Sequence, residues 1–279
     1  MRTMTVDRLS VPGAELYYEV RGRGPALLMI SGGPNDASIF SDLADHLTDR
    51  YTIITYDPRG NSRSSFEGGP ADMRVEVHAD DAARLIAAVD EGPAYVFGSS
   101  GGAIYGLDLA AYYPDHVRTL VVHEPPLTSL LPDVARWRQV NEDVRDAYVS
   151  YGLRAAMELF DETTWLGTGD EGGSPPPPPN ATTEMIDRID QNMDLFFRVL
   201  IPMMYHYVPA IDVLRCGRPH VVVVVGDASG DRLPYRAASV LAKRLGTGLA
   251  HFPGDHIGFT THPEAFAERL YEAFADSGR

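Results

Sequence analysis

The chain has 279 residues, 44% of them hydrophobic, and its 39 Asp and Glu side chains outnumber 24 Lys and Arg, giving a formal net charge of −15. A surface this acidic repels phosphate backbones and anionic lipid headgroups, so we expect binding to neither nucleic acid nor membrane. Cys216 is the only cysteine, which excludes an intrachain disulfide and a cysteine-rich metal site. The first residues lack the apolar stretch of a signal peptide and the longest apolar runs are of strand length, so we expect a cytoplasmic protein.

Strands and helices alternate along most of the sequence. Two β-rich segments come first, at 5–10 and 15–20. Apolar strands and amphipathic helices then follow one another, with strands at 26–30, 51–56, 94–98, 119–123, 220–225 and 248–252 and helices at 37–47, 80–89, 102–113, 236–245 and after 261. Strands that are apolar on both faces and separated by helices are typical of a mostly parallel sheet covered on two sides. The pattern predicts an α/β fold with eight strands.

The alternation is interrupted between the sixth and seventh predicted strands. Residues 127–212 contain three helical segments, at 132–151, 153–160 and 183–200, and a Gly/Pro-rich loop at 167–180. Because this stretch lies between two strands of one sheet, we interpret it as a helical lid rather than an independent domain. The core domain is then formed by residues 1–126 and 213–279.

The strongest chemical signal is the segment GSSGG at 98–102, which matches G-x-S-x-G in one register, with Ser100 at its centre. An apolar strand precedes it and an alanine-rich helix follows. Glycines let the chain close on both sides of a serine that is held on a strained strand-to-helix turn. The following helix begins with a partial positive charge that favours an oxyanion. The segment therefore predicts a nucleophilic serine.

From about residue 15 to the C-terminus the chain resembles the α/β-hydrolase fold superfamily. The segment ISGGP at 30–34 stands where that superfamily supplies an oxyanion-hole amide, with Ser31 in place of the usual histidine. The resemblance implies that the amide of Gly32 or Gly33 serves alongside that of Gly101. The segment YDPRGNSRSS at 56–65 resembles the structural loop D-x-R-G-x-G-x-S, with Ser62 where glycine is usual.

His256 follows the last predicted strand and precedes the last helix, where the superfamily has its catalytic histidine. A neutral imidazole there can accept the proton of the serine and later deliver it to the leaving group. The alternative of a metal site built from His251, His256 and His262 fits no familiar ligand spacing and has no cysteine to support it. We predict neither a metal nor a cofactor.

The acid of the triad has three candidates. In most of the superfamily an aspartate follows the strand at 220–225, where this chain offers Asp227 and Asp231, neither in the common position. Some members take the acid from the preceding strand, where this chain has Glu124 in the segment HEPP. The segments GSSGG, HEPP and PGDH are similar to those of the zearalenone-lactonase-like subgroup, which takes its acid from a His-Glu segment. We prefer Glu124, with Asp231 and then Asp227 as alternatives.

The predicted lid is rich in large apolar side chains, some of which we expect to line a pocket above Ser100. The candidates are Trp137, Trp165, Met193, Phe197, Met204 and Tyr205. We therefore expect a serine hydrolase that cleaves a carboxylic ester or lactone of a largely apolar small molecule through an acyl-serine intermediate. Dehalogenases and epoxide hydrolases of this fold attack with aspartate instead. A cofactor-free perhydrolase, a C–C bond hydrolase with the same triad and a non-catalytic ligand-binding receptor are the alternatives. The sequence predicts no oligomeric state.

Overall fold

The computed structural model describes residues 4–69, 72–90, 92–164, 181–216 and 218–275. Its centre is one eight-stranded sheet in the order β1-β2-β4-β3-β5-β6-β7-β8. The strands are β1 Thr5–Val11, β2 Ala14–Gly22, β3 Ala26–Ile30, β4 Thr52–Tyr56, β5 Ala94–Ser99, β6 Val117–His123, β7 His220–Gly226 and β8 Leu249–Phe252. β2 pairs antiparallel with β1 and β4, and every other pairing is parallel. The predicted eight-stranded, mostly parallel sheet is confirmed.

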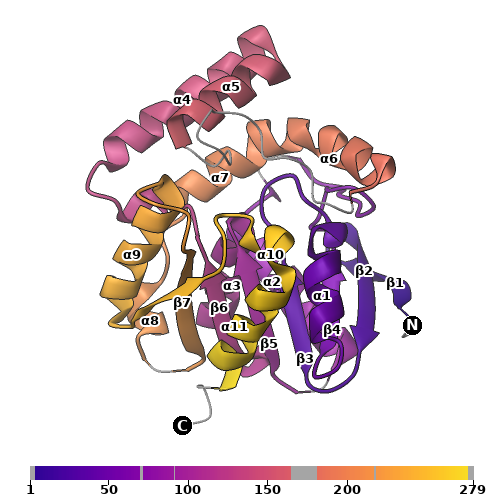
Figure 1. Cartoon of the computed structure of the whole chain (residues 1–279). Helices are drawn as coiled ribbons and strands as arrows, with labels where there is room; N and C mark the ends of the chain where they lie inside the picture. Colours follow the sequence, from indigo (N-terminus) through magenta and orange to yellow (C-terminus); the bar gives the residue numbers. More distant parts are fainter. Residues whose placement is uncertain (1–3, 70–71, 91, 165–180, 217, 276–279) are drawn as a thin grey trace.

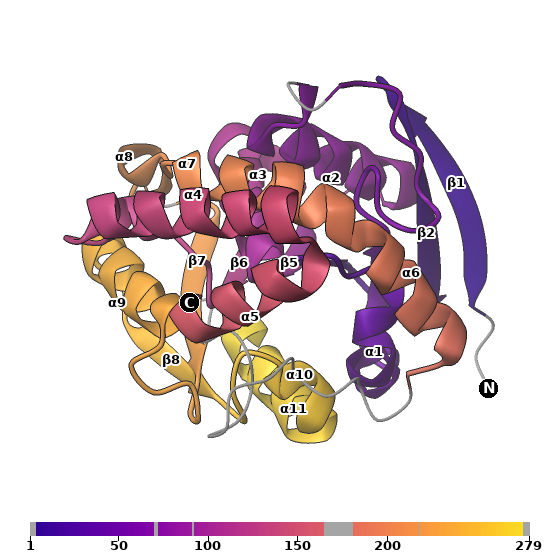
Figure 2. The same cartoon turned by 90° about the horizontal axis from the view of Figure 1, so that it is seen from above.

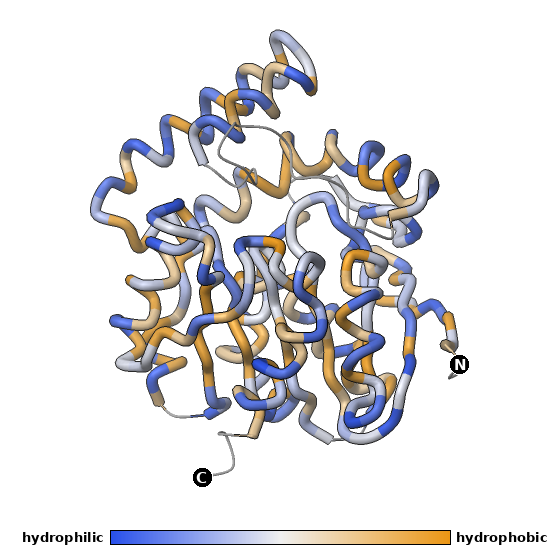
Figure 3. The backbone as a smooth tube through the Cα atoms, in the orientation of Figure 1, coloured by the Kyte–Doolittle hydropathy of each residue, from blue (hydrophilic) through white to orange (hydrophobic). Residues whose placement is uncertain are grey.

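Helices cover both faces of the sheet, which explains why its central strands are apolar throughout. All five residues of β3 are buried, and in Figure 3 the hydrophobic colouring is concentrated in the central strands. The covering helices are α1 Ser41–Leu47, α2 Val75–Val89, α3 Gly101–Tyr112, α9 Leu233–Leu245, α10 Gly258–Thr261 and α11 Pro263–Ala275. One core cluster joins α1 and α11 to the sheet, and a second joins α2, α3 and α9 to its other face (Figure 1). Burial of two apolar layers stabilises this arrangement.

A helical insertion connects β6 to β7. It comprises α4 Val134–Tyr151, α5 Leu153–Thr164, α6 Thr183–Leu195, a π-helical turn Phe196–Leu200 and α7 Ile201–His206. These elements lie above the carboxyl ends of the parallel strands (Figure 1), and seen from above they cross the middle of the sheet (Figure 2). The short helix α8 Ile211–Leu214 instead packs against α3 and α9. Within the described residues, no helix combines the length and apolarity needed to cross a bilayer.

Several helices differ in extent from the sequence prediction, two of them by five residues or more. α2 begins at Val75 rather than near residue 80, because the residues before 80 also bury apolar side chains, among them Val75 and Ala79. The helix predicted to end at residue 200 continues as far as His206, through the π-helical turn. Such single π-turns re-aim side chains and often lie at functional sites. Here Phe196 and Phe197 stand at the start of that turn.

Asp108 is a buried carboxyl on α3 that accepts a hydrogen bond from the hydroxyl of Tyr207 at 3.1 Å. Burial raises the pKa of Asp108 to about 6, although the Tyr207 hydroxyl lowers it. Because the pKa of this carboxyl is higher in the folded state than the value near 4 in the unfolded state, the group stabilises the folded state at pH values below 4. This stabilisation is lost as the pH rises through 6. Asparagine does not titrate, so it lacks this pH dependence. The free energy of unfolding of Asp108→Asn minus that of the wild type should therefore be about 2 kcal/mol larger at pH 8 than at pH 4. Urea denaturation at both pH values measures this. Asp115→Asn, an exposed position beyond the same helix, serves as control, and an equal effect of Asp108→Asn at both pH values would contradict the expectation.

Candidate active site

Ser100 occupies a sharp turn between β5 and α3. Its φ of 56° and ψ of −123° are strained for a residue with a side chain. The flanking glycines permit the turn: a Cβ on Gly102 would lie 2.1 Å from the carbonyl oxygen of Ile30, and one on Gly98 would lie 2.6 Å from that of Gly102. The amide of Ser100 donates to the carbonyl of His123 at 2.9 Å. The sequence motif thus folds into the elbow expected for a presented nucleophile.

Glu124 and His256 are joined across the sheet edge. Nδ1 of His256 lies 2.7 Å from Oε2 of Glu124, whose Oε1 accepts the amide of Gly226 at 2.9 Å. Because a carboxylate can only accept, Nδ1 of the neutral ring carries the proton and Nε2 is left free to act as a base. Burial alone would raise the pKa of the Glu124 carboxyl, but the hydrogen bond with His256 and the nearby imidazoles hold it at about 2. Glu124 therefore stays ionised throughout the neutral range.

The two alternative acids lie elsewhere. Asp227 is exposed and its Oδ1 lies 3.2 Å from Nδ1 of His251. Asp231 is also exposed. Of the three carboxylates considered from the sequence, Glu124 is the one that binds His256. Among the described residues no three His, Cys, Asp or Glu side chains gather as potential metal ligands.

The loop after β3 brings a glycine next to the first residue of α3. Nδ2 of Asn35 donates to the carbonyl of Gly32 at 2.9 Å, and because C=O and N–H point in opposite directions across a trans peptide, the N–H of Gly33 points away from that side chain. A Cβ built on Gly101 would lie 3.6 Å from the nitrogen of Gly33, and one on Gly32 would lie 2.5 Å from the nitrogen of Gly101. Gly101 begins α3, so its N–H lacks an intrahelical acceptor. Gly33 and Gly101 thus lie next to each other at the elbow, and Gly32 is in close contact with the nitrogen of Gly101.

Ser100 and His256 line one cavity of about 380 Å³ between the sheet edge and the helical insertion. No hydrogen bond joins their side chains in the described part of the chain. The walls are mostly apolar, and the insertion contributes Met157, Phe160, Met185, Ile189, Phe196 and Ile201.

Four of the six predicted lining residues do line this cavity: Met193, Phe197, Met204 and Tyr205. The prediction for Trp137 is wrong, because its side chain is buried in the core of the insertion and does not line the cavity. Composition reveals that an aromatic residue is present but not which face of its helix meets the pocket. Trp165 lies outside the described residues.

Sequence reasoning missed a second pair beneath the elbow. Oγ of Ser99 lies 2.9 Å from Nδ1 of His123, and the rings of His123 and His256 stack with centroids 6.1 Å apart. Burial lowers the pKa of His123 to about 4, so this ring is neutral and adds no positive charge beside His256. The signal available in the sequence is position alone, since His123 directly precedes Glu124.

Comparison with known proteins agrees with this architecture. Residues 25–193 match the family described as alpha/beta hydrolase fold. The chain therefore belongs to the alpha/beta hydrolase family. It is 36% identical over 277 residues to the uncharacterized hydrolase YraK of Bacillus subtilis, with 96% of each chain covered. It is 26% identical over 278 residues to the zearalenone hydrolase of Bionectria ochroleuca, with 98% of each covered. The crystal structure of an alpha/beta hydrolase from Sphaerobacter thermophilus superposes with a TM-score of 0.68 at 25% identity, covering 96% of this chain and all of that one.

Proposed function

We propose that the protein is a serine hydrolase that cleaves an uncharged, largely apolar carboxylic ester or lactone. One observation carries the proposal: Nδ1 of His256 is held 2.7 Å from the ionised Glu124, while the same imidazole and Ser100 line one apolar cavity. This arrangement supplies the carboxylate-oriented base that acyl transfer through a serine requires. The relationship to a zearalenone hydrolase supports a lactone as substrate.

In the proposed reaction, Nε2 of His256 removes the hydroxyl proton of Ser100 as Oγ forms a bond to the carbonyl carbon. The negative charge that develops on the carbonyl oxygen is stabilised by the amides of Gly33 and Gly101. Collapse of this intermediate breaks the ester bond, and the imidazolium delivers its proton to the leaving oxygen. Water, deprotonated by the same imidazole, then attacks the acyl carbon. The acyl–Oγ bond breaks, the imidazolium returns its proton to Oγ, and the acid and free Ser100 are released. Glu124 stabilises the imidazolium in both halves.

The charge of the cavity restricts the substrate. Its described lining includes the carboxylates of Asp161 and Asp190 but no Lys or Arg, and the chain carries a net charge of −15. An anionic acyl group would enter a negative potential, and the described lining offers no Lys or Arg to bind it. We expect neutral acyl groups to be preferred.

A panel of p-nitrophenyl esters tests both parts of the proposal. We expect p-nitrophenyl butyrate to be hydrolysed, with kcat/KM at least about tenfold above that of the hemisuccinate ester of similar length, because transfer of an unpaired carboxylate costs more than 1.4 kcal/mol. Macrocyclic and small lactones, followed by acid release, extend the series. No turnover of any ester or lactone would sink the proposed function, and a preference for hemisuccinate would refute the charge argument alone.

A further inference from the structure

Helix α6 uses two adjacent faces, one to line the cavity and one to contact the core domain. Met185, Ile189 and Met193, four residues apart, line the cavity. Arg188 and Asn192, also four residues apart, contact the loop that follows β3, and Asn192 also contacts the loop that follows β4. Residues spaced by four share one side of a helix, so each face is continuous along α6. The same helix therefore forms a cavity wall and touches the core domain beside the oxyanion amides.

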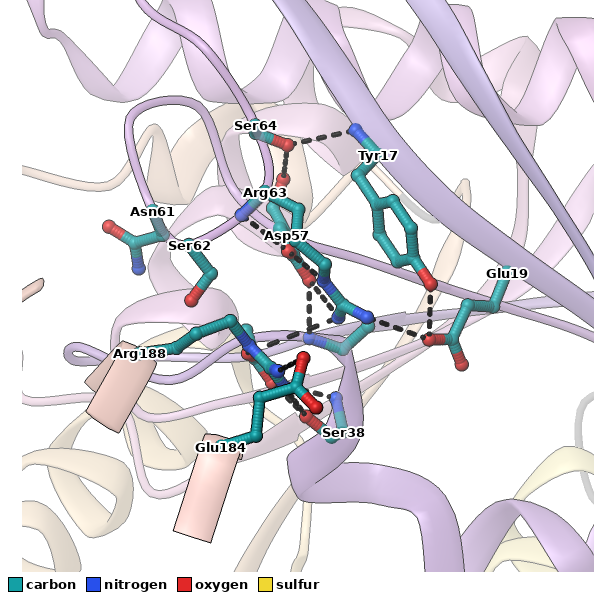
Figure 4. Close-up of polar contacts among 12 residues, drawn as sticks. Tyr17, Glu19, Ser38, Asp57, Asn61, Ser62, Arg63, Ser64, Glu184 and Arg188 are labelled. Carbon is teal, nitrogen blue, oxygen red and sulfur yellow. Dashed lines mark hydrogen bonds and ion pairs between the residues drawn. The ribbon is translucent and has the colours of Figure 1, made fainter. Parts of the chain in front are cut away.

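Arg188 holds the far end of the loop that follows β3. Its Nε donates to Oδ2 of Asp36 at 2.7 Å, and its Nη2 donates to Oγ of Ser38 at 3.0 Å. Asp36 is fully buried and caps the following turn by accepting the amide of Ser38 at 2.9 Å. Figure 4 shows Arg188 reaching from the helix to Ser38, next to the ion pair between Asp57 and Arg63. A guanidinium fork that bridges two groups fixes position as well as charge.

Asn192 holds the middle of the same loop and ties it to the next one. Its Nδ2 donates to the carbonyl of Pro34 at 2.7 Å and to Oγ of Ser62 at 2.9 Å, and its Oδ1 accepts the amide of Ser62 at 2.8 Å. Ser62 has a φ of 50°, the left-handed conformation that favours glycine. The buried side chain of Asn192 thus satisfies the polar groups of a strained residue of the core domain.

We propose that Arg188 and Asn192 are positioning residues that fix the oxyanion amide of Gly33 from the helical insertion. Between them they bind Pro34, which directly follows that amide in the chain, and Asp36 and Ser38, which come shortly after it. The insertion then sets the geometry of the reaction centre as well as enclosing the substrate. This inference rests on the proposed function, because it assigns Gly33 an oxyanion.

Arg188→Met tests the inference with p-nitrophenyl acetate, whose acetyl group is too small to depend on the cavity wall. We expect kcat to fall about 10- to 100-fold, since oxyanion donors act mainly in the transition state, while KM changes less than threefold. Arg188→Lys keeps a positive charge beside Asp36 but cannot bridge Asp36 and Ser38 as the guanidinium does, so its kcat should lie between those of the wild type and Arg188→Met. Asn192→Asp, which removes the donor to Pro34, should also lower kcat.

Two comparisons separate positioning from general damage. Arg154→Met, an equal loss of charge at an exposed residue that pairs with Glu158 within α5, should keep kcat within twofold. Hydrogen exchange of residues 31–38 should accelerate in Arg188→Met but not in Arg154→Met. If Arg188→Met keeps kcat on the acetate ester within twofold of wild type, the inference is wrong, whatever happens with longer esters. If the wild type hydrolyses no ester, the proposed function fails first, and unchanged exchange at 31–38 would then overturn the inference independently.

Discussion

Ser100→Ala is expected to lower kcat on p-nitrophenyl butyrate by at least about 10⁴-fold, because no other group can form the acyl intermediate. The residual rate should reflect the oxyanion amides and substrate binding alone, so KM should change little. Alanine fits the space of serine at the elbow and keeps the same strained φ of 56°. The loss of rate should therefore come without unfolding, which the thermal midpoint checks.

Covalent labelling supplies the second measurement for this prediction. A fluorophosphonate should modify the wild type at Ser100, located by mass mapping, and should leave Ser100→Ala unmodified. Ser239→Ala is a matched control, since its hydroxyl donates to the carbonyl of Tyr235 within α9, and it should react and turn over like the wild type. Retention of full esterase activity by Ser100→Ala would exclude the serine mechanism.

The fold could be predicted because its signals are local. Apolar runs such as 26–30 and 94–98 are long enough for a strand and apolar on both faces, and their alternation with amphipathic helices favours a covered parallel sheet. The elbow is equally local, since its glycines and Ser100 are contiguous. The pairing of Glu124 with His256 spans 132 residues, and it was expected only because the chain resembles a family in which this segment supplies the acid.

Contacts made by the insertion had no such signal. The bonds from Asn192 to Ser62 and Pro34 cross 130 and 158 residues, and nothing in the periodicity of 183–200 distinguishes an asparagine that docks from one in solvent. The misassignment of Trp137 has the same cause, because helical spacing gives a face but not what the face meets. The serine at position 62 departs from the usual glycine, and its left-handed backbone explains why glycine is usual there.

Glu124→Gln is expected to lower kcat by about 10³- to 10⁴-fold with KM nearly unchanged. The amide is close in size to the carboxylate and can still accept the amide of Gly226, so the fold should persist. It carries no charge to stabilise the imidazolium of His256, and its NH₂ group can turn toward Nδ1 and select the tautomer whose Nε2 carries the proton. That tautomer cannot remove the proton of Ser100.

The matched controls for this substitution are Asp231→Asn and Asp227→Asn, which make the same chemical change at the two exposed carboxylates and should each keep kcat within twofold.

Because the pKa of Glu124 is held at about 2 against 4.5 for an ordinary glutamate, its charge also stabilises the folded state above pH 4.5, and this contribution is lost as the pH falls toward 2. The free energy of unfolding should therefore decline less steeply with acid in Glu124→Gln than in the wild type. Near-normal turnover in Glu124→Gln together with loss in Asp231→Asn would move the acid to the loop after β7, and would require that loop to rearrange around His256 when substrate binds.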